Sequence, residues 1–226
     1  MNSDPIAMEI EQNGFCRIPN LLAPAECDAL TDAFGREAGY RRHIVMQNHG
    51  YGRGEYKYFS YPLPDLVAKL RAEFYEKLAP LANRWGEALG MDCRYPARLS
   101  DYTETCHAVG QCKPTPLILK YGEGDYNRLH QDLYGEYLFP MQMVVLLSRP
   151  GEDFEGGELI LTEQRARQQS RVRVVPLKQG DAAIIAVNDR PIPGKARSVR
   201  VKMRHGVSDV RRGNRFTLGI IFHDAR

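Results

Sequence analysis

Two residues in the stretch LHQDLYGEY (129–137), His130 and Asp132, are of types that bind metal ions and are separated by one residue. If both lie on a β-strand, the two-residue period of side chains points them to the same face, where one ion can contact both. The pattern alone is weak, because His-x-Asp arises readily by chance in a chain of 226 residues with 6 histidines. A metal site therefore requires a further ligand from elsewhere in the chain.

The best candidate for that ligand is His205, which lies near the end of a later alternating run, SVRVKMRHGV. Two histidines and one carboxylate form the metal-binding set of non-haem iron oxygenases, which leaves coordination positions open for an organic acid and dioxygen. His130, Asp132 and His205 are therefore predicted to bind iron. The other histidines, which are His223, His43, His49 and His107, are predicted to be structural or surface residues. His49 could also reach a substrate.

Arg215 follows His205 by ten residues and begins the next apolar run, with Thr217 two residues further on. On a strand these two side chains share a face, and an inward-facing guanidinium would need an anionic partner, because a buried unpaired charge is costly. Arginine binds carboxylates through two parallel hydrogen bonds. Taken alone, Arg215 fits a solvated residue at the start of a strand. Together with the three metal-ligand candidates, it predicts an acidic cosubstrate.

The elements that must position these residues differ between the two halves of the chain. Helical spacing of apolar residues predicts helices over 21–39 and 64–90, the second kinked or broken near Pro80. The segment between them, 48–64, is rich in Gly and Tyr and is predicted to be a loop or hairpin. From about residue 115 the chain contains eight short apolar or alternating runs separated by turns: PLILKY, RLHQDLY, QMVVLLS, GGELILT, RVRVVPL, DAAIIAV, SVRVKMRHGV and RFTLGIIF.

This pattern predicts a mainly β protein with flanking helices (α+β), in which N-terminal helices pack outside an antiparallel sandwich or barrel. We expect one compact domain over 1–226, because neither an internal repeat nor a low-complexity linker is evident. Within it, residues 1–114 would supply helical support and a lid over the substrate, and residues 115–226 the catalytic β core.

Charge is distributed unevenly along the chain. The net charge is +3, but residues 165–226 contain 15 Lys and Arg against 4 Asp and Glu, so this part carries +11 and the first 164 residues carry −8. Such asymmetry is typical of a surface that meets an anionic partner such as nucleic acid, and it is equally typical of solvated strand faces.

The remaining composition excludes several protein classes. Five cysteines without a CxxC pair argue against a disulfide framework and against a structural zinc site. The sequence contains neither an apolar run of about 18 residues nor a recognisable secretory signal. We therefore expect a cytoplasmic protein that is not bound to a membrane.

The sequence resembles the Fe(II)- and 2-oxoglutarate-dependent dioxygenases of the double-stranded β-helix (jelly-roll, cupin-like) fold over roughly residues 115–226. The resemblance is carried by YGEGDYNRLHQD, by FEGGEL (154–159), by LKQGDAAII (177–185), by HGV at 205, and by the arginine and hydroxyl residues that follow. It implies that His130, Asp132 and His205 ligate Fe(II). It also implies that 2-oxoglutarate, which is consumed with O2, is held by Arg215, Thr217 and Tyr121.

The resemblance also points to a substrate. LKYGEGDYNRLHQD aligns without gaps with AlkB-type nucleic-acid demethylases, and the whole chain looks like a bacterial oxygenase family linked to oxidative repair of alkylated DNA. It implies demethylation of DNA bases with release of formaldehyde, succinate and CO2. Residues with the composition to grip a nucleotide lie in GYGRGEYKYF, and a tyrosine-rich hairpin packed on the core explains them equally well: Tyr51, Arg53, Tyr56 and Lys57.

Two positions depart from the AlkB-type pattern, because Leu119 stands where an asparagine is usual and Ile221 where a second arginine is usual. The position of Arg215 and the GGEL turn look more like prolyl hydroxylases. A hydroxylase of a protein side chain or small metabolite is therefore the alternative hypothesis. A metal-free β-sandwich binding module is a more remote one.

Overall fold

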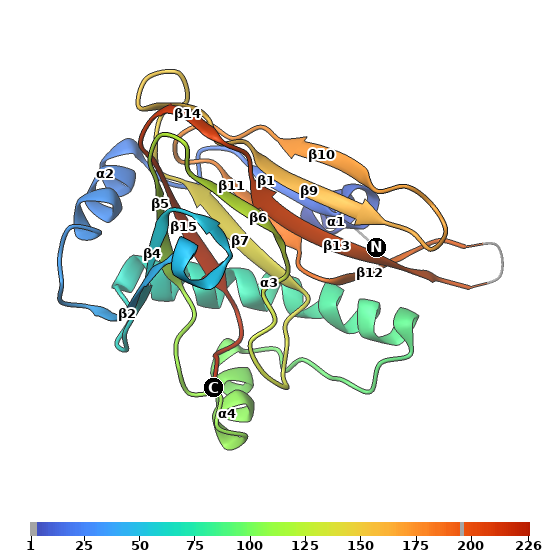
Figure 1. Cartoon of the computed structure of the whole chain (residues 1–226). Helices are drawn as coiled ribbons and strands as arrows, with labels where there is room; N and C mark the ends of the chain where they lie inside the picture. The colour runs from blue at the N-terminus through green and yellow to red at the C-terminus, as the bar shows by residue number, and fades with distance from the viewer. Residues whose placement is uncertain (1–3, 195–196) are drawn as a thin grey trace.

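The computed structural model describes residues 4–194 and 197–226, in which two antiparallel β-sheets lie against each other (Figure 1). The major sheet contains, in spatial order, β1 (Phe15–Ile18), β11 (Ala182–Ala186), β7 (Met141–Leu146), β15 (Arg215–Ile221), β5 (Leu117–Tyr121), β4 (Glu55–Phe59) and β2 (Tyr40–Val45). The minor sheet contains β10 (Arg171–Val175), β9 (Leu159–Gln164), β13 (Val199–Val207), β6 (Tyr126–His130) and β3 (Gly52–Arg53), with β12 (Asp189–Ile192) paired to β13. A separate two-stranded sheet joins β14 (Val210–Gly213) to β8 (Phe154–Gly156).

The helices lie outside the strands (Figure 1). They are α1 (Pro5–Asn13), α2 (Pro24–Ala33), α3 (Asp65–Leu89) and α4 (Leu99–Ala108), with a short 3-10 helix η1 (Met46–His49). The longest helix, α3, packs against the major sheet, and its buried residues share one hydrophobic core with central strands such as β7 and β15. The buried stripe of α3 has helical spacing and includes Leu70, Phe74, Leu78, Leu81 and Trp85.

All eight runs predicted from the sequence contain strands, and the predicted fold class, a mainly β double-stranded β-helix with flanking helices, is confirmed. The alternation that predicted them is preserved in burial. On β13, Val201, Met203 and His205 are buried, whereas Arg200, Lys202 and Arg204 are exposed. The strict period of two thus places His205 on the inner face.

The β core nevertheless extends beyond residues 115–226. Strands β1, β2, β3 and β4 come from the first 60 residues, and β1 and β2 form the two edges of the major sheet. The segment from 48 to 64 is not a hairpin, because β3 pairs with β6 in the minor sheet whereas β4 pairs with β5 in the major one. Gly52 permits this crossing, since its φ is +137° and a Cβ there would lie 2.3 Å from the carbonyl oxygen of Tyr126.

The helix boundaries also differ from those expected. α2 occupies only residues 24–33 of the predicted 21–39, and α3 continues unbroken through Pro80. Pro80 and Glu76 both lie on the exposed side of α3. The Glu76 carbonyl that loses its amide partner can therefore bind water, and the helix tolerates the proline. Among the helices of the described ranges, none is both long and apolar enough to cross a membrane.

Candidate active site

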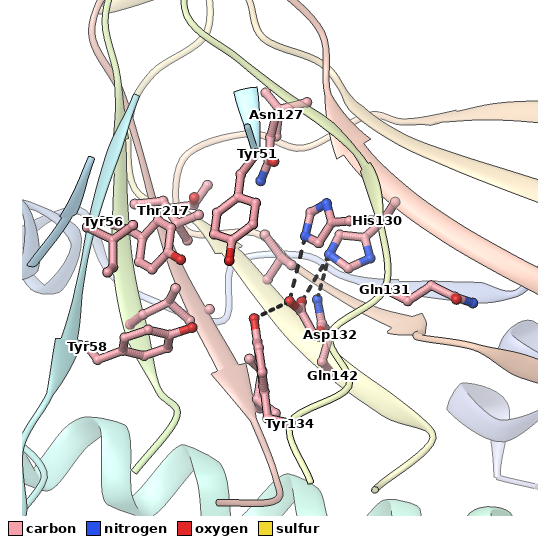
Figure 2. Close-up of a pocket in the computed structure, with 18 of the residues that line it drawn as sticks. Tyr51, Tyr56, Tyr58, Asn127, His130, Gln131, Asp132, Tyr134, Gln142 and Thr217 are labelled. Atoms are coloured by element: carbon pink, nitrogen blue, oxygen red, sulfur yellow. Dashed lines mark hydrogen bonds and ion pairs between the residues drawn. The ribbon is translucent and has the colours of Figure 1, made fainter. Parts of the chain in front are cut away.

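His130, Asp132 and His205 converge between the two sheets, as Figure 2 shows. His130 on β6 is the direct register partner of His205 on β13, and the centroids of the two rings are 4.2 Å apart. The carboxylate of Asp132 lies 3.6 Å from His130 Nε2 and 3.2 Å from His205 Nε2. One ligand atom from each residue lies within 4.8 Å of the others, so the three candidates predicted from the sequence are brought together.

The local geometry is not the simple strand that the sequence suggested. β6 ends at His130, so Asp132 lies in the loop beyond it. Earlier in β6 the register shifts between the pairs His205↔His130 and Val207↔Asn127, which leaves two residues of β6 opposite Gly206. This β-bulge aims both Asn127 and His130 into the site although they are three residues apart.

Neighbouring groups fix the orientation of two of the three side chains. His130 Nδ1 lies 2.7 Å from the carbonyl oxygen of Arg128. A carbonyl can only accept, so Nδ1 carries the hydrogen, and Nε2 is left as the free acceptor on the side of Asp132. The hydroxyl of Tyr134 donates to Asp132 Oδ1 over 2.5 Å. Hydrogen bonds of this kind orient metal ligands in proteins.

The protonation states of His130 and Asp132 also suit metal binding. Burial lowers the pKa of His130, with the neighbouring His205 acting in the same direction, so the ring is neutral at neutral pH. Burial alone would raise the pKa of Asp132, but hydrogen bonding and charge from His205 outweigh it and hold that pKa well below its usual range. A neutral imidazole and an ionised carboxylate are the forms that bind a metal ion.

Arg215 and Thr217 are both about 2% exposed and face the same cavity, as predicted from their spacing. Arg215 lies opposite Tyr121 in the β15–β5 pair, with its guanidinium carbon 5.6 Å from the ring centroid. Within the described chain, neither Nε nor Nη1 of Arg215 has a hydrogen-bond partner. Burial lowers the pKa of this arginine to about 10. An anionic ligand would satisfy these donors, so the residues present fit an organic acid.

The FEGGEL turn packs against the side chain of Arg215. Gly157 has φ +59°, and a Cβ at this position would lie 2.8 Å from Arg215 Cδ. The second glycine of the motif therefore leaves the space through which the Arg215 side chain passes.

The cavity around these residues has a volume of about 910 Å³. Of the four candidates for substrate binding, Tyr51 and Tyr56 line it, and Figure 2 shows Tyr51 between Tyr56 and the side chain of His130. Arg53 is exposed and lies 3.8 Å from Asp125. Lys57 donates to the carbonyl oxygens of Phe34 and Arg36, away from the cavity. Strand alternation explains this outcome, because Tyr56 and Tyr58 share one face of β4 and Lys57 the other.

Several cavity residues were not anticipated as site residues. Tyr134 contacts Asp132, Asn127 donates to the Tyr121 hydroxyl over 3.2 Å, and Gln142 Nε2 lies 3.0 Å from His205 Nε2. Arg41 reaches the cavity from β2. Tyr134 lies two residues beyond Asp132 and could have been noticed from sequence, whereas the others come from strands whose inward face only the register reveals.

Comparison with known sequences identifies relatives over most of the chain. Residues 54–225 match a family described as an oxygenase catalysing oxidative methylation of damaged DNA. An uncharacterised protein of Mycobacterium tuberculosis is 42% identical over 194 residues, which cover 84% of this chain and 83% of that protein.

Solved structures share the fold at low sequence identity. A Pseudomonas putida prolyl-4-hydroxylase superposes with a TM-score of 0.54 at 12% identity, covering 98% of this chain and 97% of that one. An oxidoreductase of the 2OG-Fe(II) oxygenase family from Burkholderia pseudomallei gives 0.51 at 16%, covering 97% and 91%. The α-ketoglutarate-dependent epimerase SnoN of nogalamycin biosynthesis gives 0.55 at 14%, covering 95% and 79%.

The family match shows that the chain is an oxygenase, the solved structures show that its fold is one that 2OG-Fe(II) oxygenases also adopt, and the His130, Asp132 and His205 cluster is compatible with bound iron. The chain is therefore an enzyme rather than a metal-free binding module. It belongs to the oxygenase family that is described as catalysing oxidative methylation of damaged DNA.

Proposed function

We propose that this oxygenase uses Fe(II), 2-oxoglutarate and O2 to demethylate alkylated bases in DNA. The observation that carries the proposal is one cavity that combines a His130, Asp132 and His205 cluster with a fully buried arginine, Arg215. Such a cavity offers separate places for a metal ion and for an acid, and these are the two components that the chemistry requires.

His130, Asp132 and His205 would hold the iron. Three protein ligands leave coordination positions open, and the bound iron would supply activation of dioxygen coupled to oxidative decarboxylation of the 2-oxo acid. The chain itself contributes the orientation of the ligands, through Tyr134 on Asp132 and the Arg128 carbonyl on His130. It also contributes a largely water-excluded site, because Asp132 and His205 are each less than 10% exposed.

Arg215 would bind the distal carboxylate of 2-oxoglutarate. Its Nε and Nη1 are buried donors without an acceptor among the described residues, and the planar guanidinium can donate two parallel hydrogen bonds to a carboxylate. Thr217 shares its face of β15 and Tyr121 lies opposite it on β5, so both hydroxyls would add hydrogen bonds to the acid.

The substrate assignment rests on the family description and on the size of the cavity. Pockets of about 300–1,000 Å³ enclose drug-sized ligands, and this one, at about 910 Å³, has room for 2-oxoglutarate and a further planar group. An oxygenase adds oxygen to a methyl carbon. One atom of O2 enters succinate as 2-oxoglutarate loses CO2, and the other is inserted into a C–H bond of the methyl group to give N–CH2OH. Cleavage of the C–N bond, with transfer of the hydroxyl proton to the base nitrogen, then releases formaldehyde and restores the base N–H.

A hydroxylase of a protein side chain, such as a prolyl residue, or of a small metabolite is the second candidate. It is favoured by the fold shared with the Pseudomonas putida prolyl-4-hydroxylase. Both candidates would use the same iron and 2-oxoglutarate sites, and they differ only in the group presented to the metal.

The decisive experiment is formaldehyde release from an oligonucleotide with one N-methylated base, with Fe(II), 2-oxoglutarate and O2 present, against a panel of proline-containing peptides and small acids. Succinate is measured in every reaction. Formaldehyde stoichiometric with succinate on the oligonucleotide alone supports DNA demethylation. Succinate that rises with a peptide and not with the oligonucleotide would favour the hydroxylase.

A further inference from the structure

The outer part of the cavity is lined by cations that the sequence analysis did not single out. Arg42 and Lys113 are exposed and Arg41 is half-buried, and all three line the same cavity as the metal-ligand cluster. They come from the first 164 residues, which together carry a net negative charge. The local positive charge is therefore produced by the fold and not by sequence composition.

Backbone contacts place these cations together. Arg41 Nε donates to the carbonyl oxygen of Pro114 over 2.7 Å, which sets its side chain beside the residue that follows Lys113. Lys113 in turn pairs with Ala225 through two backbone hydrogen bonds of 2.9 and 2.8 Å. Arg42 is the neighbour of Arg41 on β2. The three side chains thus gather on the side of the cavity formed by β2 and the last residues of the chain.

Among the described residues these three side chains form no close ion pair, although the charge of Asp224 acts on Arg41 at longer range. Among the described residues, no carboxylate lies within 4.0 Å of the charged nitrogens of Arg41, Arg42 or Lys113. Among the side chains that line the described part of the cavity, one carries a carboxylate, Asp132, which belongs to the metal-ligand cluster. An anion at this side of the cavity would therefore meet a net positive side-chain charge.

The basic C-terminal part of the chain behaves differently. Arg200 and Lys202 lie 3.1 and 2.7 Å from Asp189, and Arg190 and Arg165 both contact Glu163. Part of the positive charge of residues 165–226 is therefore paired with carboxylates. The side of the cavity that is lined by Arg41, Arg42 and Lys113, here called the cavity mouth, has no such close pairs among the described residues.

A row of tyrosines leads from the cations to the metal-ligand cluster. The Arg41 guanidinium carbon lies 4.3 Å from the centroid of the Tyr58 ring. Tyr58 meets Tyr56 and Tyr134 edge-on, with centroid separations of 5.3 and 6.5 Å, and Tyr134 bonds to Asp132. Figure 2 shows Tyr134 next to Asp132, with Tyr56 and Tyr58 farther from the cluster across the cavity. This wall offers an aromatic surface to a planar group that extends inward from the mouth.

We propose that Arg41, Arg42 and Lys113 form a phosphate-binding subsite, which takes the sugar-phosphate backbone of a nucleic acid strand while one base extends along Tyr58 and Tyr134 to the metal. The inference rests on the proposed function and deepens it by naming the residues that select a polyanion. A proline-containing peptide without acidic groups offers no anion to these cations, so the subsite also discriminates between a nucleic acid strand and such a peptide.

The test measures binding of a fluorescent single-stranded oligonucleotide with one N-methylated base to enzyme that holds Fe(II) and 2-oxoglutarate without O2. We compare wild type with Arg42→Gln/Lys113→Gln, whose side chains are exposed, and with Arg42→Lys, which keeps the charge. Arg17→Gln is the matched control, because Arg17 is exposed on β1 at the opposite edge of the major sheet. Arg200→Gln/Lys202→Gln tests the rival surface on β13.

The double variant at the mouth should weaken binding at low salt by on the order of tenfold or more and reduce the slope of log affinity against log salt by about 1 for each lost contact. Arg42→Lys should retain most of the slope, and the β1 and β13 variants should match wild type. Replacing the phosphodiesters beside the methylated base with uncharged methylphosphonates should weaken binding to wild type and have little further effect on the double variant.

An unchanged slope in the mouth variant, or a reduced slope confined to the β13 variant, overturns the subsite. The outcome is separate from that of the proposed function. A mouth-dependent salt slope without formaldehyde release would support the subsite and contradict demethylation. Formaldehyde release by wild type, together with an unchanged salt slope in Arg42→Gln/Lys113→Gln, would support demethylation and contradict the subsite.

Discussion

His130 on β6 and His205 on β13 stand directly opposite each other, with ring centroids 4.2 Å apart, and Asp132 reaches both from the loop beyond β6. Two neighbouring strands of one sheet, and the loop that follows one of them, thus hold all three side chains. The inner face of β13 is otherwise packed with apolar residues such as Val201 and Met203, which belong to the main hydrophobic core. The core therefore does not depend on the metal-ligand cluster.

We therefore expect His130→Ala to abolish succinate formation while leaving the far-UV circular dichroism spectrum and the thermal transition close to those of wild type. Removing one ligand eliminates the metal site, whereas His130 contributes little to the apolar core. His43→Ala is the control, since His43 is exposed and contacts Glu55 outside the cavity. Retained turnover in His130→Ala would remove this residue from the proposed site.

Arg215→Met should weaken the binding of 2-oxoglutarate without lowering the free energy of unfolding. Arg215→Met keeps most of the side-chain volume but removes a buried charge that has no anionic partner among the described residues. Apparent affinity for 2-oxoglutarate should fall by about 2–5 kcal/mol, as for loss of one member of a buried charge pair. The free energy of unfolding without cosubstrate, measured in urea, should stay the same or rise.

The corresponding control is Arg212→Met, because Arg212 is exposed and pairs only with the exposed Glu155 among the described residues. If Arg215→Met bound 2-oxoglutarate as tightly as wild type, another cation would have to hold the acid.

Tyr134→Phe tests whether the hydroxyl on Asp132 positions a metal ligand. Loss of such a hydrogen bond typically costs about 10–100-fold in metal affinity, and we expect a decrease of this size in a titration with Fe(II) under anaerobic conditions. The visible d–d absorption of a Co(II)-substituted sample should also change, which a purely structural role would not predict. Tyr137→Phe is the control on the same loop, exposed and outside the cavity lining. Equal metal affinity in the two variants would contradict the role of Tyr134.

A second buried charge pair, remote from the metal-ligand cluster, should govern acid stability. Arg71 on α3 contacts Asp224 over 2.7 Å, and both side chains are about 1–2% exposed. Burial would raise the pKa of Asp224, but the charge of Arg71 and hydrogen bonds from His107, Arg71 and Tyr61 outweigh it, so the pKa lies below its usual range. Since the folded-state pKa is below the unfolded one, this pair stabilises the fold above the unfolded pKa near 4, and the contribution is lost as pH falls through the lower folded value.

Asp224→Asn should lower the free energy of unfolding at neutral pH by about 3–5 kcal/mol, because the buried Arg71 charge loses its partner. Urea unfolding curves between pH 7 and pH 3 should show a smaller acid dependence in the variant than in wild type. Identical acid dependence in the two proteins would show that Asp224 is not the group responsible.

Residue types and spacing were enough to predict which side chains meet in the cavity and which strands carry most of them. Side-chain type and spacing selected His130, Asp132 and His205, and the alternation of β13 and β15 set the inward faces of His205, Arg215 and Thr217. These features are local, since a period of two residues decides which face a side chain occupies.

Only the tertiary structure decided which other residues meet them. Arg41 and Gln142 lie on strands that are distant in the sequence, and their places in the cavity depend on strand register and on the pairing of β2 with β4. The bulge in β6, the position of Asp132 beyond the strand end and the pairing of C-terminal cations with carboxylates are likewise products of long-range pairing. Composition does not encode these relationships, because they depend on distances between segments that the chain brings together only when it folds.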